Sequence, residues 1–279
     1  MNLTGPQPMS THPLFQYPGW APAGVTMAQT AALVAPTVAV AALRGPGVMA
    51  TLGAALIAAL FWENLFALVR RRTHTAHGLT TALIVAVMVP VTVPLWQVGL
   101  AVTMGVVLAE MVFGGRGFGF LSAAVTSLAI LIFSFPGIVL TGGEPWIAAA
   151  SLPGAAWLLA IGLISWRVLL AACATFFVVA LVQGEALDLV TTGSALIFGL
   201  LFLACDPMGA ASTNPGRWLY GGLTGGLIAL LGAGSGPAIS ANAVVFAVLL
   251  SSIFAPLLDQ LVILQNARRR TRRAERLHG

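Results

Sequence analysis

The stretch LFLACDPMGAASTNPGRW, residues 201–218, places Asp206 at the end of a long apolar run, before a loop of small polar residues. An ionisable side chain is costly there unless another group pairs with it or uses it. Asn214-Pro215 then resembles a helix start, with Asn at the cap and Pro in the first turn. Asp206 is thus either a brace for this loop, through loop amides or Arg217, or a carboxylate beside a cation path or cofactor.

The composition around this stretch is that of a polytopic membrane protein. Of the 279 residues, 58% are hydrophobic and 8% are charged, whereas a soluble domain carries about 25% charged residues. Lysine is absent, and six of the 13 arginines lie between Arg268 and Arg276, after the last apolar run. A basic cluster beside a span usually faces anionic lipid headgroups. We therefore predict membrane lipid, and no nucleic acid, as its partner.

The apolar runs predict about ten transmembrane helices. A span needs roughly 17–25 mostly apolar residues, or fewer where a helix is broken, and the third and sixth runs are short. The predicted spans are 22–43, 47–69, 78–92, 94–113, 119–140, 152–166, 168–184, 190–206, 215–232 and 241–264.

The arginines set the direction of these spans. With ten spans, twelve arginines lie on one side of the membrane and Arg44 alone on the other, whereas nine or eleven spans would divide them. The arginine-rich side should be cytoplasmic, so both termini are predicted there. We expect an irregular N-terminal tail over 1–21, a transmembrane domain over 22–264 and a basic C-terminal tail over 265–279.

Two halves of the chain, about 22–140 and 152–264, carry the same landmarks in the same order. Each has an apolar run ending at a proline, a second proline with a tryptophan, a glycine-rich break and a last run closing near a proline (Pro90, Pro94, Trp96, Pro136; Pro207, Pro215, Trp218, Pro256). Ala/Gly/Leu-rich helices punctuated by proline could also produce this likeness by chance. Five spans per half would make the halves cross in opposite senses, and in such inverted repeats the sites gather where broken helices meet.

Acidic and glycine-rich positions supply the candidate site residues. Glu63 and Glu110 lie inside predicted spans, where acids are functional candidates by default, and Asp259 is expected only to reach the headgroup region. FGGRGFGF, residues 113–120, has enough glycine for a backbone to approach a flat ligand or phosphate, or for close helix packing. No metal site is predicted, because the histidines fall in predicted tails or loops without partners at ligand spacing (His12, His74, His77, His278).

The segment GSALIFGLLFLACDPMGAASTNPGRWLYGGLTGGLIALL, residues 193–231, resembles the RnfD/NqrB membrane subunits of ion-pumping electron-transport complexes. Those subunits show an A-T-D-P element followed by small polar residues, and here it is Ala204-Cys205-Asp206-Pro207. Asp206 therefore looks like the aspartate of the family signature. The likeness covers about 50–262 and includes HGLTTALIVAVMVPVTVPLW (77–96), VFGGRG (112–117), IFSFP (132–136) and FAVLLSSIFAPLLD (246–259).

This resemblance implies ten helices in two inverted five-helix halves, similar to urea and ammonium transporters, in a bacterial inner membrane. It implies a subunit that contributes to flavin- or quinone-linked electron transfer coupled to ion translocation, with other membrane and flavoprotein subunits as partners. The residues that would line the ion path or tune a cofactor are Asp206, Glu110 and Glu63. Those that would bind a cofactor or quinone are Gly114, Gly115, Gly117, Pro207, Ser212 and Thr213.

The sequence departs from the family pattern where a cofactor is expected. Family members carry an S-G-A-T element after the fifth span, whose threonine bonds FMN covalently. Here GIVLTGGEPWIAAASLPGAA, residues 137–156, has Thr141 followed by two glycines, and Glu110 stands where a lysine is expected. We predict no covalent FMN, and instead a non-covalent flavin (FMN or riboflavin) or a quinone. Two alternatives remain: a small-solute transporter or channel of the same fold, and a structural subunit without chemistry.

Overall fold

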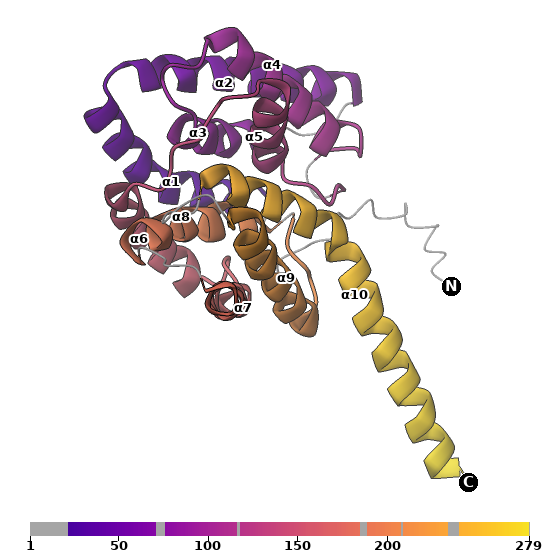
Figure 1. The fold of residues 1–279 in the computed structure, drawn as a ribbon. Coiled ribbons are helices and arrows are strands. Elements are labelled where there is room, and N and C mark those ends of the chain that lie inside the picture. Colours follow the sequence, from indigo (N-terminus) through magenta and orange to yellow (C-terminus); the bar gives the residue numbers. More distant parts are fainter. Residues whose placement is uncertain are drawn as a thin grey trace, which may run out of the picture.

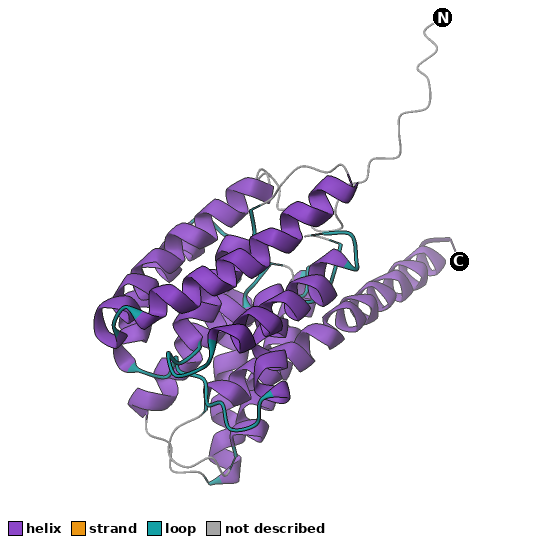
Figure 2. Cartoon of the chain, turned by 90° about the horizontal axis from the view of Figure 1, so that it is seen from above, coloured by secondary structure: helices purple, strands orange, loops and turns teal. Residues whose placement is uncertain are grey.

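The computed structural model describes residues 22–70, 76–115, 118–184, 189–207, 209–233 and 240–278, and across these ranges it contains helices and no strand (Figures 1 and 2). The predicted tail 1–21 lies outside them. The elements are α1 (Pro22–Arg44), α2 (Gly47–Arg70), α3 (Gly78–Met88), α4 (Leu95–Val106), π-helical η1 (Val107–Met111), α5 (Ala123–Ser134), α6 (Pro145–Ala160), α7 (Trp166–Gln183), α8 (Leu189–Phe198), π-helical η2 (Gly199–Ala204), α9 (Asn214–Gly232) and α10 (Ala241–His278).

The prediction of an all-helical membrane protein with ten helical segments in this order is confirmed for the described residues. Prolines fix several boundaries, because the residue before a proline avoids the helical region. Thus α3 stops at Met88 and Val89 is extended (φ −87°, ψ 127°). The sixth segment begins at Pro145 rather than at 152, since proline suits the first turn of a helix.

Several helices are shorter than predicted. Four are long and apolar enough to cross a membrane on their own: Gly24–Arg44, Gly47–Arg70, Trp166–Gln183 and Ala241–Ala267. By contrast, α3 has 11 residues and α5 has 12, or about 16–18 Å at 1.5 Å per residue, against a hydrocarbon core of about 30 Å. Short helices of this kind are tolerated at membrane depth where other protein segments cover them.

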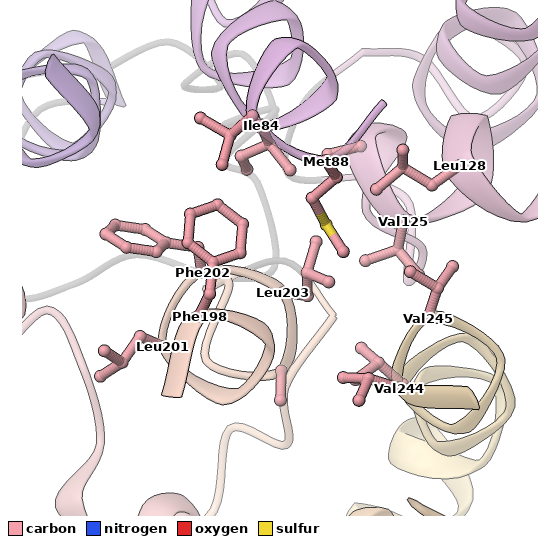
Figure 3. Close-up of a cluster of buried hydrophobic side chains, with 14 of the residues drawn as sticks. Ile84, Met88, Val125, Leu128, Phe198, Leu201, Phe202, Leu203, Val244 and Val245 are labelled. Carbon is pink, nitrogen blue, oxygen red and sulfur yellow. The ribbon is translucent and has the colours of Figure 1, made fainter. Parts of the chain in front are cut away.

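The short helix α3 is the most enclosed of these elements, with ten of its eleven residues buried. It contacts α1, α2 and α5. Figure 1 shows α2–α5 gathered apart from α6–α9, while α1 and α10 contact helices of both groups. The core between the groups is apolar and brings together side chains of α3, α5, α8, η2 and α10, including Met88, Leu128, Phe198, Leu203 and Val244 (Figure 3).

Glycines allow the most extensive helix contact, between α7 and α9. A Cβ atom built on Gly225 would overlap the backbone carbonyl oxygen of Ala172, and one built on Gly221 would meet the backbone of Val168. Small residues permit such backbone approach inside membranes.

The last helix, α10, continues through the basic segment and projects away from the bundle (Figure 2).

Candidate functional site

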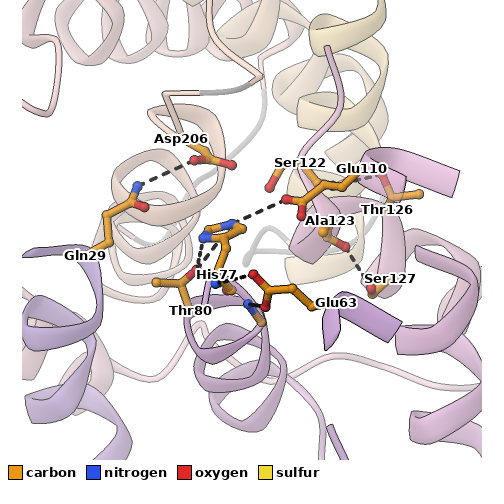
Figure 4. A network of polar contacts seen from close by, with 11 residues as sticks. Gln29, Glu63, His77, Thr80, Glu110, Ser122, Ala123, Thr126, Ser127 and Asp206 are labelled. Carbon is orange, nitrogen blue, oxygen red and sulfur yellow. Dashed lines mark hydrogen bonds and ion pairs between the residues drawn. The ribbon is translucent and has the colours of Figure 1, made fainter. Parts of the chain in front are cut away.

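Ends of several helices converge on a buried group of polar side chains, here called the polar cluster (Figure 4). Its acids are Glu63 from α2, Glu110 from η1 and Asp206, which follows η2; they are 8%, 5% and 5% exposed. The structure therefore brings the three acids named from the sequence into one region. The other members of the cluster are Gln29, His77, Thr80 and Ser122.

Glu63 closes the buried N-terminus of α3. The backbone N–H of His77 donates to its Oε1 and the N–H of Gly78 to its Oε2, each at 3.1 Å. The side chain at the α3 cap makes no capping bond of its own, so a carboxylate from α2 satisfies amides that a helix start leaves free. A negative charge there also suits the helix dipole. Glu63 thus has a structural role as well as membership of the cluster.

Glu110 is presented by a π-helical turn. The N–H of Val112 donates to the carbonyl of Val107 at 2.9 Å, and that of Gly115 to the carbonyl of Glu110 at 2.8 Å. Such turns hold one residue more than an α-turn and often occur at functional sites. The Oε1 atom of Glu110 is fully buried and accepts no hydrogen bond from the described residues. A ring nitrogen, Nε2 of His77, lies 3.5 Å from it.

Asp206 also follows a π-helical turn, closed by the Cys205 N–H on the carbonyl of Leu200 at 3.0 Å. Its own carbonyl accepts the amides of Gly209 and Ala210. Its carboxylate faces the polar cluster, where Gln29 Nε2 lies 3.5 Å from Oδ1. The turn after Asp206 is therefore held partly by backbone, while the side chain points inward.

The brace for this loop comes from Asp259 in α10. Its carboxylate accepts the backbone N–H and hydroxyl of both Ser212 and Thr213. Asp259, which was expected only to reach the headgroup region, therefore has a bracing role that the sequence did not predict. The cap of α9 is also one residue earlier than predicted, because the Thr213 side chain accepts the Gly216 N–H. Sequence reasoning missed the brace because it depends on where the loop lies against α10.

His77 was predicted to lie in a loop, without a partner at ligand spacing, and the structure places it in the turn before α3 with partners that the sequence did not reveal. It directly precedes α3, is 4% exposed, and lies between Thr80 and Glu110. The other histidines, at positions 12, 74 and 278, have no described side chains. A sequence signal existed: Thr80 follows His77 by three residues, so the two share a face if the helix starts there.

A small cavity adjoins the polar cluster. Its volume is about 10 Å³, close to the space that one water needs. The Thr81 hydroxyl, on a residue 1% exposed, has no hydrogen-bond partner in the described part of the chain. The cavity is lined by Gln29, Leu33, His77, Thr80, Thr81, Ile84, Ser122, Ala124, Phe202 and Asp206.

The predicted cofactor-binding residues are divided between different places. Gly114 and Gly115 follow η1 with left-handed φ of 113° and 103°, and an added Cβ on Gly115 would meet no atom within 4 Å. Gly117 lies outside the described residues. Pro207 is buried beside Asp206, whereas the hydroxyls of Ser212 and Thr213 donate to Asp259.

The opposite end of α3 is tied by a second set of contacts. Arg44 donates to the carbonyl of Val87 at 2.8 Å and pairs with Glu144. Thr141 donates to the carbonyl of Met88 through both its N–H, at 2.8 Å, and its hydroxyl, at 3.0 Å. The Thr141 hydroxyl is thus engaged with the backbone of α3, which does not fit a phosphoester to FMN at this position.

A larger cavity, of about 350 Å³, opens near that end of α3. This volume is in the range of small-molecule pockets. None of the described side chains that line it is ionisable, so it differs in kind from the polar cluster. The lining residues are Pro90, Thr92, Val93, Pro94, Gln97, Gly137, Ile138 and Val139.

Apolar helices and buried carboxylates at helix breaks together define a multi-pass integral membrane protein. Comparison with known sequences refines this class. The profile of the NQR2, RnfD, RnfE family matches residues 22–150 and 137–268. The chain belongs to this family, and the resemblance seen in its sequence is confirmed.

The curated relatives share one name, which describes a subunit of the Na(+)-translocating NADH-quinone reductase. The protein of Pseudoalteromonas atlantica is 33% identical over 270 residues, which covers 76% of this chain and 66% of the relative. Those of Chromohalobacter salexigens and Pseudomonas aeruginosa are 30% and 32% identical, covering 76% of this chain and 64% and 66% of theirs. The chain thus spans slightly less than two thirds of the length of these relatives.

Proposed function

We propose that this protein is a membrane subunit of a redox-driven, ion-translocating electron-transport complex, and that the polar cluster lies on the ion path. The observation that carries the proposal is the convergence of Glu63, Glu110 and Asp206 on one buried polar cluster, whose member Asp206 also lines a water-sized cavity. Intramembrane acids are costly and mark ion or proton pathways. The names of the relatives, which describe a sodium-translocating reductase, support the same role.

The proposed orientation places the polar cluster toward the cytoplasm. Arg167 donates to Asn214 at 3.3 Å, which supports placing the α6–α7 and α8–α9 connections at one end of the bundle. Arg44, the only arginine predicted on the other side, pairs with Glu144 in the α5–α6 connection. Both contacts agree with the twelve-to-one division of arginines and with the positive-inside rule.

Cysteine tagging tests this orientation. With Cys173 and Cys205 replaced by alanine, single cysteines at positions 143 and 279 should react with an impermeant maleimide from opposite sides of right-side-out vesicles. Position 143 should label in intact vesicles and position 279 only after permeabilisation. Labelling of both from one side would contradict a ten-helix crossing pattern.

Helix contacts support the proposal of two inverted halves. Corresponding pairs of helices are in contact in the two halves. These pairs are α1–α3 and α6–α8, α2–α4 and α7–α9, and α4–α5 and α9–α10. The first and fifth helices of the halves also meet, α1 with α6 and α5 with α10. We infer an arrangement similar to urea and ammonium transporters, with the polar cluster near helix breaks as such designs require.

For the redox group we infer a non-covalent flavin or a quinone, supplied by or shared with partner subunits. The partly buried backbone at Gly114 and Gly115 supports this assignment, since open space beside Gly115 lets a flat ligand approach. When bound, such a group supplies the electron-transfer chemistry. The chain itself would contribute the polar cluster on the ion path.

Purification from the native membrane through an affinity tag tests the function. We expect several co-purifying subunits, a flavin absorbance spectrum and electron transfer that depends on the translocated ion. The band of this chain should show no flavin fluorescence on a denaturing gel, because Thr141 is engaged with α3. A single polypeptide that lacks redox groups and conducts urea in vesicles would instead favour the channel alternative.

A further inference from the structure

Buried hydroxyl groups in the helices share a recurrent hydrogen-bonding pattern. Six of them donate to the backbone carbonyl four residues earlier, at 2.7–2.8 Å, a bond that serine and threonine often make in helices. A hydroxyl bonded in this way needs no acceptor outside its own helix. These hydroxyls belong to Thr37, Thr126, Ser127, Ser151, Thr224 and Ser251.

Thr81 in α3 departs from this pattern, although the residue is only 1% exposed. Its hydroxyl has no hydrogen-bond partner in the described part of the chain. The carbonyl four residues earlier is that of His77, and it is already engaged. It accepts the amides of Thr80 and Thr81, and the Thr80 hydroxyl lies 2.8 Å from it. Because a buried donor without an acceptor costs free energy, the Thr81 hydroxyl needs a partner from outside its own helix.

The small cavity beside the polar cluster provides room for that partner. Thr81 lines this cavity, whose volume of about 10 Å³ is close to the space that one water needs. Because the cavity is so small, a single molecule within it touches groups on every side. Asp206 also lines it, and the carboxylate of Asp206 points into the polar cluster (Figure 4). The cavity thus brings one buried donor and one carboxylate within reach of the same molecule.

We propose that the cavity binds one water molecule, which accepts the hydrogen of the Thr81 hydroxyl and donates one of its own to the carboxylate of Asp206. A water suits both groups, because it accepts from a hydroxyl and donates to a carboxylate at the same time. A bare cation does not, since it would bind the Thr81 oxygen and leave the hydroxyl hydrogen without an acceptor. The water satisfies a group of the fold itself and is therefore independent of the proposed ion path.

This water links the two groups of helices. Thr81 lies in α3, within the group α2–α5, whereas Asp206 follows η2, beside the group α6–α9 (Figure 1). The labelled side chains of the core between these groups are apolar (Figure 3). A satisfied polar contact at the edge of an apolar core favours one arrangement of the packed surfaces, since it forms only when both partners reach the same cavity. Thr81 is therefore a positioning residue for Asp206.

Solid-state NMR of the full-length protein in lipid, labelled at threonine and aspartate, tests this water. In spectra edited for magnetisation transfer from water, the Thr81 signal, assigned as the one lost in Thr81→Val, should gain intensity early. Thr224, whose buried hydroxyl donates within α9, is the matched control and should not. The carboxyl signal of Asp206, assigned through Asp206→Asn, should shift in Thr81→Val. It should keep its position in Thr224→Val and in Thr81→Ser, which retains the hydroxyl.

The unmodified protein decides the proposal even if Thr81→Val does not fold, because Thr81→Ser also removes the Thr81 signal and assigns it. A Thr81 signal that gains intensity as slowly as that of Thr224 overturns the proposal, since the cavity then holds no water. An Asp206 carboxyl signal that receives no magnetisation from water overturns the link between the two residues. Replacing NaCl by choline chloride should leave the transfer to Thr81 unchanged, whereas transfer that appears only without sodium would identify a cation site instead.

Discussion

Asp206→Asn is expected to fold and assemble normally but to lose at least about tenfold in ion-coupled electron transfer, a barrier change of about 1.4 kcal/mol. Asparagine keeps the size of the side chain and an oxygen that can accept from Gln29, which lies 3.5 Å away. The backbone bonds from Gly209 and Ala210 to residue 206 are untouched. The substitution therefore removes the charge and little of the structure.

Asp259→Asn is the matched control, and the opposite result is expected. Its carboxylate accepts four hydrogen bonds from Ser212 and Thr213, and an amide can accept at only one of its two positions. Loss of charge-assisted bonds should destabilise the fold by about 1–3 kcal/mol, seen as lower yield and melting temperature in detergent. The folded fraction should still turn over normally.

These two variants separate a charge that is used from a charge that braces a loop. The measurements are the melting temperature of the purified chain and the turnover per assembled complex. If Asp206→Asn assembles well and keeps its electron transfer and ion dependence, Asp206 has no part in the ion path. If Asp259→Asn loses turnover at full stability, the site extends further toward α10 than the polar cluster does.

Gly225→Ala is expected to destabilise the protein by about 1–3 kcal/mol, the usual cost of forcing an extra methyl group into a packed interior. The added Cβ would overlap the Ala172 carbonyl, so α7 and α9 would have to separate. Backbone atoms cannot rotate aside as a long side chain can. We expect poor expression and early aggregation on size-exclusion chromatography.

The neighbouring residue, Gly226, supplies the control for Gly225→Ala. A Cβ on Gly226 would meet only Thr175 Cγ2 at 3.6 Å, an ordinary contact. Gly226→Ala should therefore behave like the unmodified protein, although both substitutions make the same chemical change on the same helix. Equal behaviour of the two variants would mean that α7 and α9 do not pack as closely as described.

Much of the fold was accessible from sequence because prolines and apolar runs act locally. Pro90 and Pro136 end helices for a reason contained in the neighbouring residue, so α3 and α5 were found with ends misplaced by a few residues. The π-helical turns of η1 and η2 were not predicted. They change the hydrogen-bond register without an evident change in residue type, and the apolar runs containing Glu110 and preceding Asp206 read as ordinary helices.

The candidate site was also predicted only in part from the sequence. Glu63, Glu110 and Asp206 were identified because acids are rare in membrane spans, and the fold brings them together. His77 was missed because its partner, Glu110, is 33 residues away in the chain, as was the bracing role of Asp259, whose partners lie 46 and 47 residues away. Such pairings depend on how helices pack, which residue spacing in one segment does not encode.

Both ends of α3 are fastened by groups from other elements: Glu63 at its start, and Arg44 with Thr141 at its finish. A helix of eleven residues with its internal bonds intact is stiff along its axis, about 16 Å long. Because both of its ends are bonded to other elements, α3 forms a rigid connection between those elements. A displacement of one end along the axis must appear at the other end or break the contacts that hold it, so the polar cluster and the contacts of Arg44 and Thr141 are mechanically linked through α3.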